Sequence, residues 1–481
     1  MRCGHGVSES EGSAADPGWR RWMPLVLASV ATFLLIAYTT VVTVAVPAVA
    51  TDLDVGFGTL QWVIDVYTIA LAALLVPVGS LSDRVDRRTL LATGFGLFAF
   101  SSLICATAGG TTVLTVGRCA QGIAAAMMFA TTLPLVESSY TGRARTVAFS
   151  IWGAVSGLAA AAGNVIGGLL SVFGWRAIFV MAVPVTSVAA VLSLRVLPRQ
   201  PTHRPGPVDM VGMVLFSLGV GDMVVTALLL ADGAAGWQIA AGTVLCLISA
   251  VWFVVHERRA DTPVFPRTMV ARPGFIAAVL VALAYYCASF GPLPVLSQWL
   301  QEEAGQAAVG TALTLSIQPV LFFAVSAVLG PRLGVVDRRI PFLWGLLLCG
   351  AGCAAFLLVT VVPGWSALLP AMSLTGVGAG LISPVLPAAA MSDMSSDQTG
   401  VASTTMNAAR QLGISLGVAG CALTVRVSRE AGHGWGFGVS AVGVVAGLLC
   451  FATAGAVGWI LRHRSGVSAG LPPGQQVAPE Q

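Results

Sequence analysis

The chain has 481 residues, of which 56% are hydrophobic and only 10% are charged, and its mean hydropathy is +0.86. Soluble domains carry charge on about a quarter of their residues, so this composition excludes a soluble globular protein and indicates a chain that lies in lipid. All 25 basic residues are arginine, which excludes a Walker A loop and a lysine Schiff base, and no HExxH zinc motif occurs. We therefore expect no enzyme activity, no cofactor and no metal ion, and we expect no nucleic-acid partner.

The chain contains fourteen apolar stretches that are long enough to cross a bilayer as helices, since about 20 residues span the hydrocarbon core. Polar tails at 1–21 and 462–481 flank them. The predicted spans are 22–46, 60–80, 90–108, 113–135, 147–170, 177–196, 209–230, 238–256, 274–298, 309–330, 340–361, 365–388, 400–424 and 437–461.

The distribution of arginine supports this count. If the N-terminus lies in the cytoplasm, most of the 25 arginines fall in tails and connections on the cytoplasmic side. Positive residues are retained on that side, and a miscounted helix would invert the bias. We expect a multi-pass plasma-membrane protein with both termini in the cytoplasm. The absence of lysine beside abundant Ala, Gly, Val and Arg indicates a GC-rich bacterial genome.

Two longer connections, at 195–208 and 257–274, divide the spans into groups of six, two and six. This predicts an N-terminal six-helix bundle over 22–196, two extra helices with their loops over 197–273, and a C-terminal six-helix bundle over 274–461. Paired six-helix halves are a transporter arrangement, with a substrate site near the midplane where the halves meet.

The connection after the second span reads GSLSDRVDRR over 79–88. Taken alone, it is either a solvated loop that obeys the positive-inside rule or a tight turn. In such a turn Asp83 would pair with nearby arginines or face a helix N-terminus. The run resembles the G-x-L-a-D-r-x-G-r-[RK] signature of the major facilitator superfamily, with Asp86 in place of the usual glycine. The resemblance implies a cytoplasmic gate that is formed by Gly79, Asp83, Arg84, Arg87 and Arg88.

Further stretches resemble, in chain order, the 14-helix drug:proton antiporter branch of that superfamily. They are residues 61–67, 118–122, 175–184 and 400–413, together with a glycine-rich antiporter motif in span five. In this motif Asn164 stands where the branch has proline, and the set is Gly153, Gly157, Gly163, Asn164, Gly167 and Gly168. The resemblance implies an all-helical major facilitator fold with fourteen transmembrane helices, in a 6+2+6 arrangement, and an exporter.

The first span departs from the branch at two positions. Where the branch carries an acid and then an asparagine, this chain has Tyr38 and Thr43. Loss of the acid removes a charge that would attract cationic drugs, so a neutral or anionic substrate becomes the better expectation.

Ionisable groups inside spans are rare here, and they mark transport pathways in other membrane proteins because inserting them costs a few kcal/mol. Asp65 is the first candidate for proton coupling, with Arg118 placed to tune it, and Asp222 is the second. Two alternatives remain open: Asp65 is an interface residue that only pairs with Arg118, and Asp222 has a structural role in the extra helix pair.

The thirteenth span carries Asn407, Arg410 and Gln411 on or near one helix face. This trio either binds a substrate carboxylate or hydroxyl, or forms hydrogen bonds between helices. The predicted substrate pocket consists of Tyr38, Thr43, Tyr67, Gln121, Tyr285, Tyr286, Asn407, Arg410 and Gln411.

These features together predict a secondary active transporter that exports a small, mostly apolar molecule, such as a drug, an antibiotic or a secondary metabolite. We expect proton antiport by alternating access, with the substrate, protons and bilayer lipid as partners and with a monomeric protein. The alternatives are an uncoupled facilitator and a transport-inactive membrane sensor of the same fold.

Overall fold

The computed structural model describes residues 20–55, 57–199, 209–231, 233–261, 263–333, 336–362, 364–392, 394 and 398–463. The predicted tails at 1–21 and 462–481 fall almost entirely outside these ranges. The side chains of Thr43 and Asn164 also lie outside the description.

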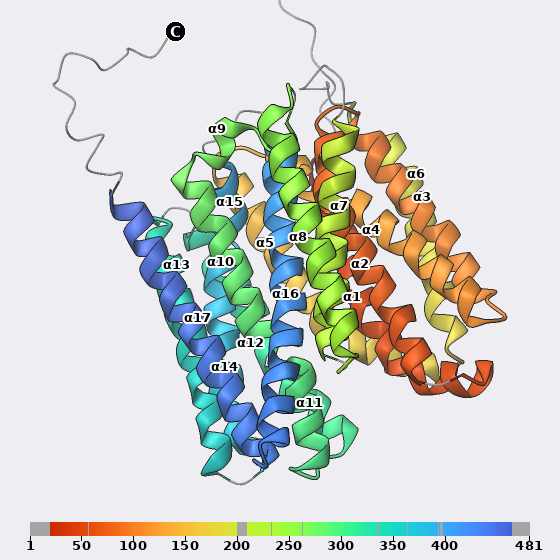
Figure 1. Ribbon diagram of the computed structural model, residues 1–481. Coiled ribbons are helices and arrows are strands. Elements are labelled where there is room, and N and C mark those ends of the chain that lie inside the picture. The colour runs from red at the N-terminus through yellow and green to blue at the C-terminus, as the bar shows by residue number, and fades with distance from the viewer. Residues whose placement is uncertain are drawn as a thin grey trace, which may run out of the picture.

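The described ranges contain long helices and no strand (Figure 1). Thirteen helical stretches among them are long and apolar enough to cross a membrane. The 30-residue helix α5 (Gly142–Ser171) is a further long helix, and it packs between α1 (Met23–Leu53) and α12 (Ala308–Leu333). The expectation of an all-helical fold with many spans is confirmed, and the chain is a multi-pass membrane protein.

The N-terminal half begins with a short 3-10 turn at Arg20–Trp22 and continues through six long helices. These are α1 (Met23–Leu53), α2 (Phe57–Ser82), α3 (Arg87–Ala106), α4 (Thr111–Ser139), α5 (Gly142–Ser171) and α6 (Arg176–Val196). Helix α4 packs against α1, α2 and α3, and it therefore lies at the centre of this half.

The C-terminal half also crosses six times, but proline and glycine interrupt two of its spans. The predicted span 274–298 covers α10 (Pro273–Phe290) and most of α11 (Leu293–Glu302), which separate at Gly291 and Pro292. The predicted span 365–388 covers a 3-10 turn, α14 (Leu369–Ile382) and the start of α15 (Leu386–Met391), and the helix is interrupted around Pro384. Proline removes a backbone donor and obstructs the preceding turn, which accounts for these breaks. The elements are α10 (Pro273–Phe290), α11 (Leu293–Glu302), α12 (Ala308–Leu333), α13 (Arg339–Ala354) with a 3-10 extension (Ala355–Thr360), a 3-10 turn (Trp365–Leu368), α14 (Leu369–Ile382), α15 (Leu386–Met391), α16 (Thr399–Glu430) and α17 (Trp435–His463).

Two additional helices, α7 (Met210–Ala231) and α8 (Gly236–Arg259), lie between the halves in the sequence. Helix α7 contacts α2 of the first half and α16 of the second, while α8 packs on α7 and has no buried residue (Figure 1). Phe216, Phe253 and Phe265 pack edge to face, with centroids 5.5–5.9 Å apart, and join both helices to the segment before α9 (Arg267–Val270). The pair therefore covers the seam between α2 and α16 from the side.

Helix ends that are distant in sequence meet on one face of the bundle, which we call the arginine-rich face. The Tyr140 hydroxyl donates to the Arg21 carbonyl (2.9 Å), and Arg88 Nη1 donates to the Leu197 carbonyl (3.1 Å). The face carries Arg20, Arg21, Arg84, Arg87, Arg88, Arg143, Arg145, Arg195, Arg199, Arg258, Arg259, Arg267, Arg272, Arg332, Arg338, Arg339 and Arg462.

On the opposite face, Asp52 at the end of α1 accepts hydrogen bonds from Trp175 (3.1 Å) and Arg176 (2.6 Å). The Arg176 guanidinium lowers the pKa of this carboxyl. The ion pair is thus present above the ordinary carboxyl pKa and is lost only as the pH falls through the lowered value.

The glycines of α5 divide between two partner helices. A Cβ at Gly163 would lie 2.1 Å from Thr40 Oγ1, and one at Gly167 would lie 2.7 Å from a carbonyl of α1, so these positions hold α1 against α5. Gly153 and Gly157 instead face the other half, where a Cβ at Gly157 would lie 2.8 Å from the Phe322 ring of α12. One end of α5 thus holds its own half together, and the other end contacts the opposite half.

This packing predicts that Gly163→Ala destabilises the protein. Overpacking a tight contact costs about 1–3 kcal/mol, so the substitution should lower the Tm of the purified protein in detergent. Gly168→Ala is the matched control, because a Cβ there meets nothing within 4 Å. Equal Tm values for the two variants would contradict the assigned packing.

Candidate functional site

The two halves are joined on the arginine-rich face by a buried carboxylate. Asp83, at the end of α2, is 1% exposed. Its Oδ1 accepts from Arg87 Nη2 (3.1 Å), and its Oδ2 accepts from the backbone N–H of Val401 (3.1 Å) in the first turn of α16. Free N–H groups and the helix dipole make a helix N-terminus a favourable site for a negative charge. Asp83 therefore binds the C-terminal half through a hydrogen bond between a charged group and the backbone.

Close contact of the same two helices requires a glycine at position 79. A Cβ at Gly79 would lie 1.9 Å from Thr404 Oγ1 of α16. Any larger residue would separate α2 from α16 at the level of Asp83.

The remaining residues of the 79–88 motif shape the turn into α3. Asp86 caps α3, because its carboxylate accepts from the Arg88 N–H (3.3 Å) and from the Thr89 hydroxyl (3.0 Å). Capping of this kind stabilises a helix start by about 1 kcal/mol, which gives a physical role to the residue that replaces the motif's glycine. Arg84 is half-buried beside this turn.

The contact predicts a local opening in Asp83→Asn. A neutral amide binds a backbone N–H less strongly than a carboxylate, and hydrogen bonds to charged groups contribute about 1.5–3 kcal/mol. Hydrogen–deuterium exchange over residues 399–406 should become roughly tenfold faster or more. Asp52→Asn, which removes a carboxylate on the opposite face, should leave that segment unchanged. Unaltered exchange in Asp83→Asn would show that this bond does not hold the halves together.

Arg118 lies at the centre of a polar cluster inside the N-terminal half. It is fully buried. Its guanidinium donates to the carbonyls of Val63 (3.3 Å) and Tyr38 (3.3 Å) and to Gln121 Oε1 (3.0 Å). Gln121 Nε2 in turn donates to the Ser102 hydroxyl (2.8 Å). The arginine thus connects α1, α2 and α4, and Gln121 extends the connection to α3.

The two tyrosines of this cluster use their hydroxyls within the half. Tyr67, whose ring lies 4.3 Å from the Arg118 guanidinium, donates to the Leu35 carbonyl (2.8 Å). Tyr38 donates to the Ile178 carbonyl (2.6 Å) of α6. Both hydroxyls therefore satisfy backbone acceptors of neighbouring helices.

The two candidate acids have different surroundings. Asp65 is half-buried on α2, two residues from Val63, whose carbonyl accepts from Arg118. Asp222 on α7 accepts a long hydrogen bond from Ser249 of α8 (3.4 Å). Asp65 therefore lies next to the Arg118 cluster, and Asp222 lies between the two additional helices.

A second buried arginine lies where the two halves meet. Arg410 of α16 is 5% exposed, and its guanidinium carbon lies 4.6 Å from the Tyr286 ring, 5.2 Å from the Trp152 ring and 5.5 Å from the Phe129 ring. Its Nη1 donates to Asn407 Oδ1 (3.3 Å). Phe129 and Trp152 belong to α4 and α5, whereas Tyr286 belongs to α10, so both halves contribute. We call these five residues the Arg410 site.

The Arg410 site holds more hydrogen-bond donors than its own acceptors occupy. No carboxylate of the described residues forms an ion pair with Arg410. The buried Asn407 Nδ2 and Trp152 Nε1 atoms also lack a hydrogen-bond partner within the described part of the chain. Each cation–π contact contributes about 0.5–2 kcal/mol, while desolvating one charge costs several kcal/mol.

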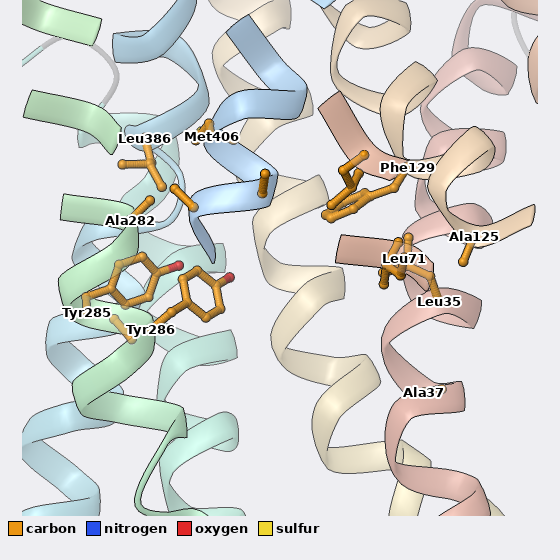
Figure 2. Packing of buried hydrophobic residues seen from close by; sticks show 14 of the residues in the cluster. Leu35, Ala37, Leu71, Ala125, Phe129, Ala282, Tyr285, Tyr286, Leu386 and Met406 are labelled. Carbon is orange, nitrogen blue, oxygen red and sulfur yellow. The ribbon is translucent and has the colours of Figure 1, made fainter. Parts of the chain in front are cut away.

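Aromatic side chains of α10 continue the site within the C-terminal half. The Tyr285 and Tyr286 rings lie 4.2 Å apart, and Phe290 stacks on Tyr286 at 5.0 Å. Figure 2 shows both tyrosines reaching from α10 toward the half that carries Phe129. Gln411 follows Arg410 on α16 and is buried.

The residues of the predicted pocket therefore divide into two groups. Tyr38, Tyr67 and Gln121 belong to the Arg118 cluster, whereas Tyr285, Tyr286, Asn407 and Arg410 lie together at the junction of the halves. Sequence reasoning missed Phe129 and Trp152. The only available signal for Trp152 was a bulky indole beside Gly153 in a span otherwise composed largely of small residues.

The sequence profile of the Major Facilitator Superfamily matches residues 28–418. The chain belongs to this superfamily, and it is a membrane transporter rather than an enzyme.

Among its relatives, the puromycin resistance protein pur8 of Streptomyces alboniger is 31% identical over 424 residues, which cover 86% of this chain and 83% of that protein. The methylenomycin A resistance protein of Streptomyces coelicolor is 29% identical over 444 residues, or 89% of this chain and 91% of the relative. The human organic anion transporter MFSD10 has a similar fold, with a TM-score of 0.66, 15% identity, and coverage of 92% of this chain and 100% of that one.

Proposed function

We propose that this protein exports a small, mostly apolar molecule in exchange for protons, by alternating access. The observation that carries the proposal is the position of the Arg410 site, to which both halves contribute side chains. On the arginine-rich face, the hydrogen bond between Asp83 and Val401 joins the same two halves. A molecule bound there would cross that face only after α2 and α16 separate.

Two features support rocking of the halves as the transport motion. The α2–α16 contact includes the hydrogen bond from the Val401 N–H to the Asp83 carboxylate and a close approach at Gly79, and α5 meets α12 through Gly153 and Gly157. Small residues allow helices to pack closely without interlocking side chains. Such surfaces can separate and re-form at low cost.

Orientation and direction follow from charge and from the relatives. Arginine-rich connections are retained in the cytoplasm, so the arginine-rich face and both ends of the chain are cytoplasmic. The relatives are named as resistance proteins, which favours export over uptake.

Asp65 is the proposed proton carrier. It is half-buried in a spanning helix beside a fully buried arginine. A carboxylate in this setting can take up a proton on one side of the membrane and release it on the other, with Arg118 favouring release. One charge that crosses 100 mV is worth about 2.3 kcal/mol and supports roughly a 50-fold substrate gradient.

Everted vesicles that contain wild-type protein should lose lumenal protons when a transported compound, found with methylenomycin A and a panel of dyes, is added as substrate. Asp65→Asn should abolish the proton signal, because the amide cannot carry a proton. Asp222→Asn is the control and should behave as wild type, since Asp222 faces α8. Proton movement that persists in Asp65→Asn and disappears in Asp222→Asn would assign coupling to the additional helices. Substrate flux without any proton signal would identify an uncoupled facilitator, and the absence of both would favour a sensor.

A further inference from the structure

We propose that the Arg410 site binds the charged group of an anionic substrate, so that the exported molecule is an apolar or aromatic monoanion. The claim that the bound molecule is exported rests on the proposed function. The choice of an anion rests on the charges and donors of the site itself.

The first argument is charge balance. Arg410 is 5% exposed in a membrane-spanning helix and has no carboxylate partner in the described structure. Among the helices that build the site, α5 and α10 contain no acidic residue, and α4 and α16 contain only Glu137 and Glu430, near their ends. Glu137 pairs with Arg145 (2.6 Å) and Glu430 with Arg426 (3.7 Å). The protein therefore leaves the charge of Arg410 for a ligand to neutralise.

The second argument is the hydrogen-bonding capacity of the neighbours. Asn407 Oδ1 is occupied by Arg410, which leaves the Nδ2 group as a donor, and the Trp152 indole can only donate. Both groups are at least 99% buried and unpartnered among the residues described. A carboxylate, sulfonate or enolate accepts hydrogen bonds without donating one, so it matches this set. A cation matches none of these groups.

The aromatic rings indicate the shape of the remainder of the ligand. Phe129 stacks on Trp152 with ring centroids 6.1 Å apart, and Tyr286 faces the guanidinium from the other half. Flat apolar surfaces pack favourably against such rings. A substrate with its anionic group on Arg410 and an aromatic body among these rings would contact both halves at once.

An anionic substrate changes the electrical balance of transport. Export of one monoanion in exchange for one entering proton moves two positive-charge equivalents inward, whereas export of a neutral molecule moves one. The gradient that 100 mV supports then rises from about 50-fold to roughly 2,000-fold.

The test uses two probes of nearly equal shape, 1-naphthalenesulfonate and neutral 1-naphthalenesulfonamide, because a sulfonate stays charged at any working pH. Binding is measured by calorimetry on the full-length protein in lipid nanodiscs. We expect the sulfonate to bind at least tenfold more tightly than the sulfonamide, and Arg410→Gln to remove this difference. Trp152→Phe keeps the stacked ring but loses the N–H donor, and it should weaken sulfonate binding about tenfold and sulfonamide binding less, because hydrogen bonds to a charged acceptor are stronger.

Arg426→Gln is the matched control, since Arg426 lies on the same helix and pairs with Glu430 away from the site. It should bind both probes as wild type does. Size-exclusion profiles identify any variant that does not fold, and Trp152→Phe provides the conservative test if Arg410→Gln fails. Equal affinity for the two probes, an unchanged preference in Trp152→Phe, or no sulfonate binding at millimolar concentration would each overturn the proposal.

A second measurement separates this inference from the proposed function. In proteoliposomes with a potential imposed by potassium and valinomycin, the charge moved per sulfonate is compared with the proton flux. Two charges and one proton per sulfonate agree with both proposals. One charge and no proton would reject proton coupling and retain the anion site. Proton-coupled export of the sulfonamide but not of the sulfonate would retain antiport and reject the anion site.

Discussion

A charge buried inside a bilayer must obtain partners from the protein, because lipid supplies none. Three of the buried charged side chains among the described residues meet this constraint in different ways. Asp83 uses a helix N-terminus of the opposite half, Arg118 uses carbonyls and an amide of its own half, and Arg410 uses aromatic rings from both. The partners of Asp83 and Arg410 include groups of the opposite half, whereas the carbonyls around Arg118 belong to its own half.

The Arg118 cluster therefore provides a fixed frame for the N-terminal half. Its hydrogen bonds reach α1, α2, α3 and α4, and the Tyr38 hydroxyl extends them to α6. Helix α5 contacts α12 of the other half through glycines, and α2 and α4 contact α16. A half whose helices are linked in this way, and which meets its partner partly through small residues, is suited to move as one body. Helix α7, which touches α2 and α16 together, would shield the seam from lipid during such a motion.

The sequence predicted the helices well because apolar length and arginine placement both follow from the bilayer. Helix α5 was expected at 147–170 and lies at Gly142–Ser171, and α6 was expected at 177–196 and lies at Arg176–Val196. The breaks near Gly291 and Pro384 were not anticipated. An apolar run predicts that the chain crosses the membrane, but it does not say where the hydrogen-bond ladder is interrupted.

The site was harder to predict than the fold. Tyr38 and Tyr67 were predicted to line the pocket, and their hydroxyls donate to backbone carbonyls of adjacent helices, which the sequence did not indicate. Phe129 and Trp152 were missed for the opposite reason, since an aromatic residue in an apolar span gives no sign of what it faces. The sequence allowed either a solvated loop or a tight turn in which Asp83 pairs with arginines or faces a helix N-terminus. The position of α16 supports the second interpretation, because its Val401 N–H donates to Asp83.

Alternating access is tested most directly by two distances measured on the same protein. Spin labels at Thr141 and Asp337 report on the arginine-rich face, and labels at Phe173 and Glu302 report on the opposite face; all four positions are exposed. In a variant without native cysteines, double electron–electron resonance spectroscopy would follow both distances between the spin labels as pH and substrate change. The account predicts opposite changes, with one pair separating as the other approaches. Distances that change together, or that stay fixed while substrate is transported, would contradict it.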